Sequence, residues 1–294
     1  MPTLHRMPSR RATTCGTSSP TTRCPTSHGV GRLTFRKAEV RRNRHTVAVS
    51  WYQTFFDADY LRVFGPFVDG DRARQEALAI AGILGAAPGS VILDLACGQG
   101  RHAIPLRAAG FEVLGLDLSD VLLAAARARD GDLPVIRADM RILPLADASV
   151  DAVVNLFNAF GYFDDSGEAD LSVLREVRRI LRPGGVFVQE VHHRDALVRS
   201  WEPRTVHPPY ENGLVVTEER DWDGVRGRHC VSYLLASPDA PPRRIDHSLR
   251  VYTVTELVAL HERAGLRVQQ VDGDLAGTPL SPDTPLAVIV SRRD

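Results

Sequence analysis

A glycine-rich segment flanked by carboxylates is the part of the sequence best suited to chemistry. Asp94 stands four residues before Gly98, and Gly100 follows in a turn that joins an apolar run to a helical pattern. Glycines let the backbone approach a ligand closely, and the start of the following helix offers unpaired N–H groups. Asp117 and Asp139 each follow a later apolar run. This pattern predicts a ligand site with acidic side chains at its edge.

The carboxylates distinguish between two kinds of adenine-containing ligand. The glycine turn also fits the G-x-G-x-x-[GA] pattern of dinucleotide-binding proteins, although so short a pattern occurs by chance. Asp94 at the mouth of the turn would repel a pyrophosphate but attract an ammonium and a sulfonium. Asp117 is placed to accept hydrogen bonds from both ribose hydroxyls. We expect Asp139 to accept a hydrogen bond from an adenine amino group, with Leu118 and Met140 in apolar contact with the ring. The ligand described in this way is S-adenosylmethionine.

Methyl transfer from such a ligand is an in-line displacement, which needs a general base only when the acceptor arrives protonated. The candidates for that base follow a predicted strand at 186–191. They are His193, whose ordinary pKa of about 6.5 suits a base near neutral pH, and Glu190. Asn155 stands near the end of another strand, where we expect the methyl group to emerge. Three side chains of a later segment are expected to hold an acidic or aromatic acceptor: Arg220, Arg250 and Tyr252.

Alternating apolar runs and helical patterns must position these residues. Helices are expected at 51–64 and from Asp71 to the Pro88-Gly89 stop signal. Short apolar runs that read as buried strands follow at 91–95, 111–116, 133–137, 150–156 and 186–191. Helical patterns between them cover 101–109, 119–129 and 165–181. Such alternation predicts a Rossmann-like α/β fold, with an open, mostly parallel sheet and helices on both faces.

Residues 200–252 break the alternation. Strands are expected at 214–222, 229–235 and 244–252 without helices between them, so they should pair antiparallel. A T-x-x-E capping box at Thr253 then starts a helix that ends at Gly265, and strands at 266–272 and 286–290 complete the sheet. Because ligands of open α/β sheets bind at the carboxyl ends of the strands, we expect the antiparallel insert to cover that crevice.

The motifs resemble those of class I S-adenosylmethionine-dependent methyltransferases. Residues 94–100 look like the first motif of that family, Asp117 like its ribose-binding acid, and residues 138–140 like its adenine loop. Residues 181–185 look like the turn before its fifth strand. More loosely, residues 51–60, 155–163 and 250–252 are similar to a bacterial subgroup that acts on small molecules. The resemblance implies that Tyr52 or Tyr60 contacts the cofactor.

Composition excludes several classes of protein. No apolar stretch approaches the roughly 18 residues of a membrane span. Residues 1–46 contain ten Lys and Arg and one acid, whereas the other residues contain 26 basic and 35 acidic side chains. The acidic remainder argues against nucleic acid as a partner. Four scattered cysteines predict neither a disulfide framework nor a zinc site, which favours a reducing cytoplasm.

We therefore expect a basic, Arg/Ser/Thr-rich tail at 1–46 that is disordered or lies upstream of the true start. A methyltransferase domain is expected at 47–294, with the insert at 200–252 forming the acceptor pocket. The predicted activity is metal-independent methylation of a small molecule. Two alternatives remain open at this point: an NAD-dependent oxidoreductase, supported by the G-x-G-x-x-A match, and a non-catalytic scaffold that binds S-adenosylmethionine.

Overall fold

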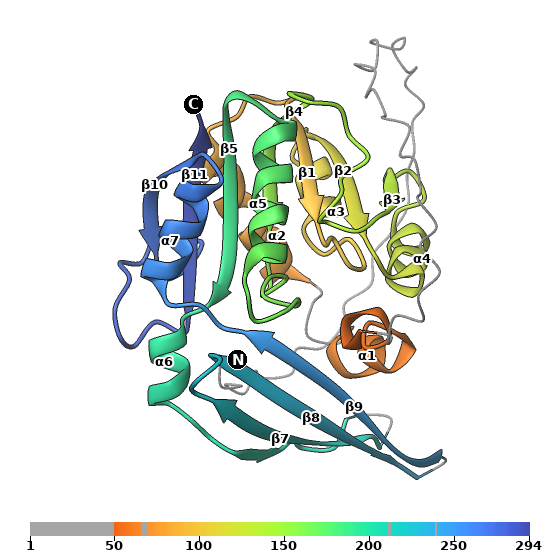
Figure 1. Cartoon of the computed structure of the whole chain (residues 1–294). Coiled ribbons are helices and arrows are strands. Elements are labelled where there is room, and N and C mark those ends of the chain that lie inside the picture. Colours follow the sequence, from red (N-terminus) through yellow and green to blue (C-terminus); the bar gives the residue numbers. More distant parts are fainter. Residues whose placement is uncertain (1–49, 66–69, 211–212, 239) are drawn as a thin grey trace, which may run out of the picture.

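The structure is a computed structural model that describes residues 50–65, 70–210, 213–238 and 240–294. Its centre is a seven-stranded sheet with the order β10-β11-β5-β4-β1-β2-β3 (Figure 1). The strands are β1 (Val91–Leu95), β2 (Glu112–Asp117), β3 (Val135–Arg137), β4 (Val150–Asn155), β5 (Leu181–His192), β10 (Leu266–Asp272) and β11 (Leu286–Arg293). Strands β1 to β5 pair in parallel, whereas β11 runs antiparallel to both β5 and β10. The mostly parallel sheet expected from the sequence is confirmed.

Helices cover both faces of this sheet. They are α2 (Asp71–Leu84), α3 (Ala103–Ala108), α4 (Asp120–Arg129), α5 (Glu168–Ile180) and α7 (Val254–Arg263). Successive side chains of a strand point to opposite faces, so each strand contributes to two cores. In β1, Leu93 packs in the core that contains residues of α5 and α7, while Ile92 packs in the core that contains residues of α2 and α3. The two layers of helices pack against the parallel strands, whose carboxyl ends lie together at the lower edge of the sheet in Figure 1.

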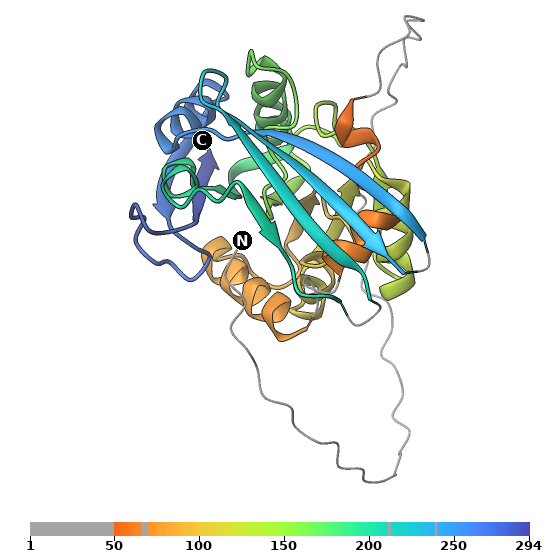
Figure 2. The ribbon, with the colours of Figure 1, turned by 90° about the horizontal axis from the view of Figure 1, so that it is seen from below.

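A second, antiparallel sheet lies across those carboxyl ends. It has the order β6-β7-β8-β9, with bounds Arg204–Val206, Val215–Asp223, Arg228–Ser237 and Ala240–Arg250. Figure 2 shows its long strands, in teal and blue, crossing the lower face of the domain. Val216, Val231 and Tyr233 of this sheet pack in one core with Phe55 and Phe64 from the start of the described chain. The antiparallel insert that the sequence predicts is therefore confirmed, and it lies on the side of the domain at which the parallel strands end.

The structure differs from the expected elements in two places. The helix expected at 51–64 is divided into a 3₁₀ helix, η1 (Trp51–Gln53), and α1 (Ala58–Phe64). The cause is the Asp57 carboxylate, which accepts hydrogen bonds from the N–H groups of Asp59 and Tyr60 at 2.8 and 3.2 Å and so caps a new helix. Helix α6 (Arg194–Arg199) and strand β6 were not predicted, because six and three residues give too little periodicity.

The basic segment expected to be a tail, residues 1–46, lies outside the described residues. Residues 47–49, which follow it, lie outside them as well. Across the described ranges, no helix is both long enough and apolar enough to cross a membrane.

Candidate active site

The turn after β1 brings the backbone close to the carboxyl end of the sheet. Gly98 and Gly100 have φ angles of 54° and 78°, a region that residues with a Cβ atom disfavour. A Cβ at Gly100 would also lie 3.1 Å from the Ile104 side chain and 3.2 Å from that of Leu133. Glycine is therefore required at Gly100 by both backbone angle and packing. Gly98 lines the pocket, whereas Gly100 lies in the same turn without lining it.

A pocket of about 950 Å³, including solvent at its mouth, opens in front of the glycine turn. Its walls come from η1 and α1, the glycine turn, the end of β2, and the loops after β3 and β4. The structure brings together here eight of the predicted cofactor-binding residues: Tyr52, Tyr60, Asp94, Gly98, Asp117, Leu118, Asp139 and Met140. Residues from five separate segments of the chain thus form one site.

Asp94 presents a buried carboxylate to this pocket. Its side chain is buried, and its Oδ2 atom has no hydrogen-bond partner in the described part of the chain. Burial raises the pKa of Asp94 to about 6, although His102 and the Ala103 N–H act in the opposite direction. A buried carboxylate oxygen without a partner is costly, so the site favours a ligand that brings a cationic hydrogen-bond donor. The ammonium group of S-adenosylmethionine fits this requirement.

Asp117 is held by the backbone on both carboxylate oxygens. Its Oδ2 accepts a hydrogen bond from Gly98 N at 2.9 Å, and its Oδ1 accepts one from Ser119 N at 2.8 Å. Burial raises the pKa of Asp117, while these backbone hydrogen bonds act to lower it. Each carboxylate oxygen has a second lone pair, so the side chain can still accept a pair of hydroxyl groups. This arrangement suits the two hydroxyls of a ribose.

Asp139 lies in the pocket wall but already has a partner. Its carboxylate binds Arg141, with Oδ1 3.0 Å from Nε and Oδ2 2.6 Å from an Nη atom. Burial alone would raise the pKa of Asp139, but the Arg141 hydrogen bonds outweigh it and hold the pKa below its ordinary value. The Arg141 guanidinium also lies 4.5 Å from the centre of the Phe163 ring. An adenine amino group would therefore share this carboxylate with Arg141.

A charged cluster beside the glycine turn was not predicted from the sequence. Arg101 donates a hydrogen bond to Glu76 at 2.5 Å, and the same carboxylate oxygen lies 3.0 Å from His102 Nε2. Arg101 and His102 line the pocket, whereas Glu76 supports them from α2. The sequence did contain a signal for the position of Arg101 and His102, because both directly follow Gly100 at the start of a helix. The support from Glu76 was not, because it comes from a separate element.

Comparisons with known proteins agree with this geometry. Residues 92–185 match the methyltransferase domain family. The chain is 30% identical over 205 residues to the dTDP-3-amino-3,6-dideoxy-alpha-D-glucopyranose N,N-dimethyltransferase of Streptomyces fradiae, covering 66% of this chain and 76% of that protein. It is 27% identical to the putative methyltransferase YqeM of Bacillus subtilis, covering 64% of this chain and 77% of that protein. The chain belongs to the class I S-adenosylmethionine-dependent methyltransferases.

Comparison with solved structures shows a shared fold. The CcbJ methyltransferase of Streptomyces caelestis superimposes with a TM-score of 0.71 at 22% identity, over 82% of this chain and 98% of that one. At this identity the likeness concerns the fold alone. The family membership also resolves the choice that the glycine pattern left open, because it identifies a methyltransferase that uses S-adenosylmethionine rather than an NAD-dependent oxidoreductase.

Asn155 lies beneath the methyltransferase pocket and does not line it. Its side-chain NH₂ donates to Leu95 O at 3.0 Å and Ala159 O at 3.1 Å, and its Oδ1 accepts from Gln189 at 3.3 Å. Gln189 in turn lies 3.0 Å from His261. The amide of Asn155 is occupied within the core, where it joins the ends of β1 and β4.

Both candidates for a general base are also used within the fold. Glu190 is buried, and its carboxylate accepts a hydrogen bond from Phe157 N at 3.2 Å. Nδ1 of His193 lies 2.9 Å from the carbonyl oxygen of Thr284, and its side chain is 6% exposed. Neither side chain lines the pocket. The structure therefore does not bring His193 or Glu190 to the reacting position that the sequence indicated.

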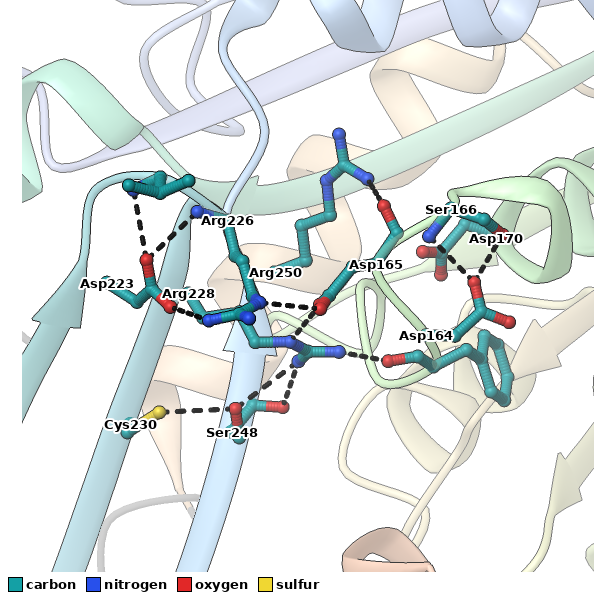
Figure 3. A network of polar contacts seen from close by, with 12 residues as sticks. Asp164, Asp165, Ser166, Asp170, Asp223, Arg226, Arg228, Cys230, Ser248 and Arg250 are labelled. Atoms are coloured by element: carbon teal, nitrogen blue, oxygen red, sulfur yellow. Dashed lines mark hydrogen bonds and ion pairs between the residues drawn. The ribbon is translucent and has the colours of Figure 1, made fainter.

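The three insert residues expected to hold the acceptor bind other protein groups. Arg220 pairs with Glu218 and donates to Thr205 at 2.7 Å, and Tyr252 donates to Asp170 at 2.7 Å. Arg250 donates to the carbonyl oxygen of Asp165 at 2.5 Å (Figure 3). None of the three lines the pocket. The partners of these three side chains lie in the insert, in the loop after β4 and in α5.

The contacts in Figure 3 instead join the insert to a wall of the pocket. Arg228 of β8 contacts the Asp165 carboxylate at 2.5 Å and also donates to the carbonyl oxygen of Phe163. Phe163 and Tyr162, in the loop after β4, line the pocket. Sequence reasoning missed Tyr162, although it lies within the segment 155–163 on which the subgroup resemblance rests.

Within the described residues, no group of three His, Cys, Asp or Glu side chains could hold a metal ion.

Proposed function

We propose that this methyltransferase methylates an amino group of a small polar molecule, with a nucleotide-linked amino sugar as the model acceptor. When bound, S-adenosylmethionine would supply a sulfonium methyl group: a C–N bond to the neutral acceptor amine would form as the C–S bond breaks and the thioether leaves, and the ammonium product would release its proton to water. The relative from Streptomyces fradiae, by its name, acts on such an amino sugar. A second relative, from Streptomyces venezuelae, is named for a dTDP-3-amino-3,4,6-trideoxy-alpha-D-glucopyranose and is 28% identical.

In this proposal, different residues of the pocket bind different groups of the cofactor. Asp94 binds the ammonium group, Arg101 binds the carboxylate, and Asp117 accepts hydrogen bonds from the ribose hydroxyls. Glu76 holds Arg101 in place by its ion pair of 2.5 Å. The single observation that carries this assignment is the buried, unpartnered Oδ2 atom of Asp94 in a pocket that the cationic Arg101 also lines. A zwitterionic amino acid group needs one anionic and one cationic partner, and the site offers both.

Aromatic side chains of the pocket exclude water from the reacting groups in this proposal. Tyr60, Phe56 and Tyr162 line the pocket opposite the glycine turn. Their ring centres lie 5.0 Å apart for Phe56 and Tyr60 and 5.7 Å apart for Phe56 and Tyr162. A closed site holds the acceptor in line with the methyl group. Excluding water also prevents transfer of the methyl group to water.

Label transfer tests this proposal directly. The full chain is incubated with S-adenosylmethionine labelled on the methyl group and with dTDP-3-amino-3,6-dideoxy-α-D-glucopyranose as the probe. We expect label in the sugar nucleotide, and we expect the Asp94→Asn variant to lose most of it. Binding of S-adenosylhomocysteine without label transfer to this probe would remove the amino sugar from the proposal while leaving the cofactor assignment intact.

We also propose a reducing cytoplasm as the location and no nucleic acid partner. Cys97 and Cys230 are free thiols, which fits that compartment. The excess of acidic side chains beyond residue 46 would repel a phosphate backbone.

A further inference from the structure

Three histidines gather on the inner side of the antiparallel sheet. His229 of β8 and His247 of β9 lie on the same face, with ring centres 6.1 Å apart. His192, at the end of β5, lies 6.2 Å from His229. The cluster therefore spans the gap between the carboxyl end of the parallel sheet and the insert. We call these three residues the histidine cluster.

Tryptophans surround the cluster on two sides. Trp222 stands directly opposite His229 in the β7–β8 pair, and the ring of Trp201 lies 5.5 Å from that of His229. On the other side, Trp51 lies 5.8 Å from His247 and 5.1 Å from Tyr162. Because Tyr162 lines the cofactor pocket, Trp51 connects the histidine cluster to the wall of that pocket.

Several polar atoms of this region have no partner within the described ranges. They are both ring nitrogens of His229, Nδ1 of His247 and Oδ1 of Asn158. His229 is only 6% exposed. Asn158 and His192 line one small cavity together, and the neighbours of Asn158, Phe157 and Ala159, line the cofactor pocket. Buried polar atoms are nearly always satisfied, so a group of four unsatisfied ones points to a ligand.

The histidines are held uncharged. Burial lowers the pKa of His229 to about 4, helped by nearby Arg220, and burial lowers that of His247 to about 3. Asp246 opposes the shift at His247 but does not overcome it, and Tyr233 lies 3.3 Å from Nε2 of that ring. Burial lowers the pKa of His192 in the same direction. The cluster thus offers neutral hydrogen-bonding groups rather than charges.

We propose that the histidine cluster and Asn158 bind the sugar ring of the acceptor, with the indoles of Trp201 and Trp222 against its apolar face. This inference rests on the proposed function and names the residues that give it specificity. A sugar presents hydroxyl groups at its edge and C–H groups on its faces. Neutral imidazole and amide groups match the former and indole rings match the latter. Neutral histidines also avoid repelling the sulfonium of the cofactor.

The test compares three histidine variants in the full chain with the labelled transfer assay and the same dTDP-amino sugar as probe. His229→Phe keeps a ring beside Trp201 but removes both nitrogens, so the fold should be retained. We expect the KM for the probe to rise about tenfold, the effect of losing a hydrogen bond to a buried group, with an unchanged Kd for S-adenosylhomocysteine. His229→Gln should recover part of the loss. His207→Gln, which alters a histidine bound to Glu218 outside the cluster, should leave the KM unchanged.

Each result has a clear consequence. Wild-type turnover of the probe with an unaltered KM in His229→Phe would overturn the acceptor role of the cluster and leave the proposed function standing. Equal losses in His229→Phe and His207→Gln would assign the effect to the sheet as a whole and would also overturn it. Absence of turnover in the wild-type chain would overturn both the proposed amino sugar and this inference, while the Kd for S-adenosylhomocysteine would still report on the cofactor site.

Discussion

The backbone N–H of Gly98 donates a hydrogen bond to the Asp117 carboxylate at 2.9 Å. This bond ties the glycine turn after β1 to the acidic end of β2, so the two cofactor motifs form a single rigid unit. The pairing of β1 with β2 also fixes the separation of these two motifs, because Leu95 lies in register with Leu116. A change at Asp117 therefore acts on both the ribose contacts and the turn.

Replacing Asp117 should weaken cofactor binding strongly. Asp117→Ala removes a charged hydrogen-bond acceptor, and we expect the affinity for S-adenosylhomocysteine to fall by about 1.5–3 kcal/mol. Asp120→Ala is the matched control, because Asp120 is a neighbouring acid whose side chain is 66% exposed in a pair with Arg137. Calorimetric titration of both variants measures the difference. An unchanged affinity in Asp117→Ala would contradict the ribose assignment.

Cofactor affinity should depend on pH through Asp94. The pKa of this buried carboxyl is raised to about 6, and only its ionised form attracts an ammonium group. Binding should therefore weaken as the pH falls through 6, by roughly tenfold between pH 7.5 and pH 5. Titrations with S-adenosylhomocysteine at both pH values measure this. Asp94→Asn, which cannot ionise, should bind weakly at both; a tenfold pH effect that persists in this variant would assign the titration to another group.

The Glu76 carboxylate should stabilise the fold as well as the pocket. Burial would raise its pKa, but hydrogen bonds from His102, Arg101 and Arg72 outweigh this and lower it to about 2. Its contribution is therefore present above the ordinary pKa near 4.5 and is lost as the pH falls toward 2. At pH 7 we expect Glu76→Gln to lower the free energy of unfolding by about 1–3 kcal/mol.

Urea unfolding measures that effect, with Glu112→Gln as control because Glu112 is an exposed acid on β2. Glu76→Gln should also raise the Kd for S-adenosylhomocysteine, since Arg101 loses its support. Equal unfolding free energies for the two variants at pH 7 would show that the cluster around Glu76 contributes no stability.

The contact between Arg228 and Asp165 should hold the insert against the wall of the cofactor pocket, so that its loss weakens cofactor binding. Arg228 is largely buried and also binds the carbonyl oxygen of Phe163, a residue of the pocket wall. We expect Arg228→Ala to lower the free energy of unfolding by about 1–2 kcal/mol and to raise the Kd for S-adenosylhomocysteine severalfold. Arg226→Ala removes a 61% exposed partner of the same Asp165 and should have a much smaller effect on both quantities. Equivalent effects of the two variants would refute a positioning role for Arg228.

The alternation of strands and helices made the parallel sheet and the glycine turn predictable. Asp94 and Asp117 lie at the ends of β1 and β2, and Gly98 lies in the turn after β1, so sequence alone located their side of the site. Asn155 satisfied the same rule, yet its amide is occupied by Leu95 O, Ala159 O and Gln189. Position at a strand end does not reveal whether a side chain points into a pocket or bonds to a neighbouring strand.

Long-range partners account for the remaining differences. The support of Arg101 by Glu76 joins residues 25 positions apart, and the contact of Arg228 with Asp165 spans 63. The histidine cluster assembles from three strands whose local patterns read only as ordinary alternation. Such juxtapositions arise from the packing of helices and of the insert on the sheet, which no local pattern encodes.

Calorimetric titration of the full chain with S-adenosylhomocysteine, using NAD as the comparison ligand, tests the cofactor site most directly. Asp94 and Arg101 in the pocket predict binding in the micromolar range for S-adenosylhomocysteine and no measurable heat for NAD. Binding of NAD without binding of S-adenosylhomocysteine would contradict the assignment of the carboxylates on which the site is built.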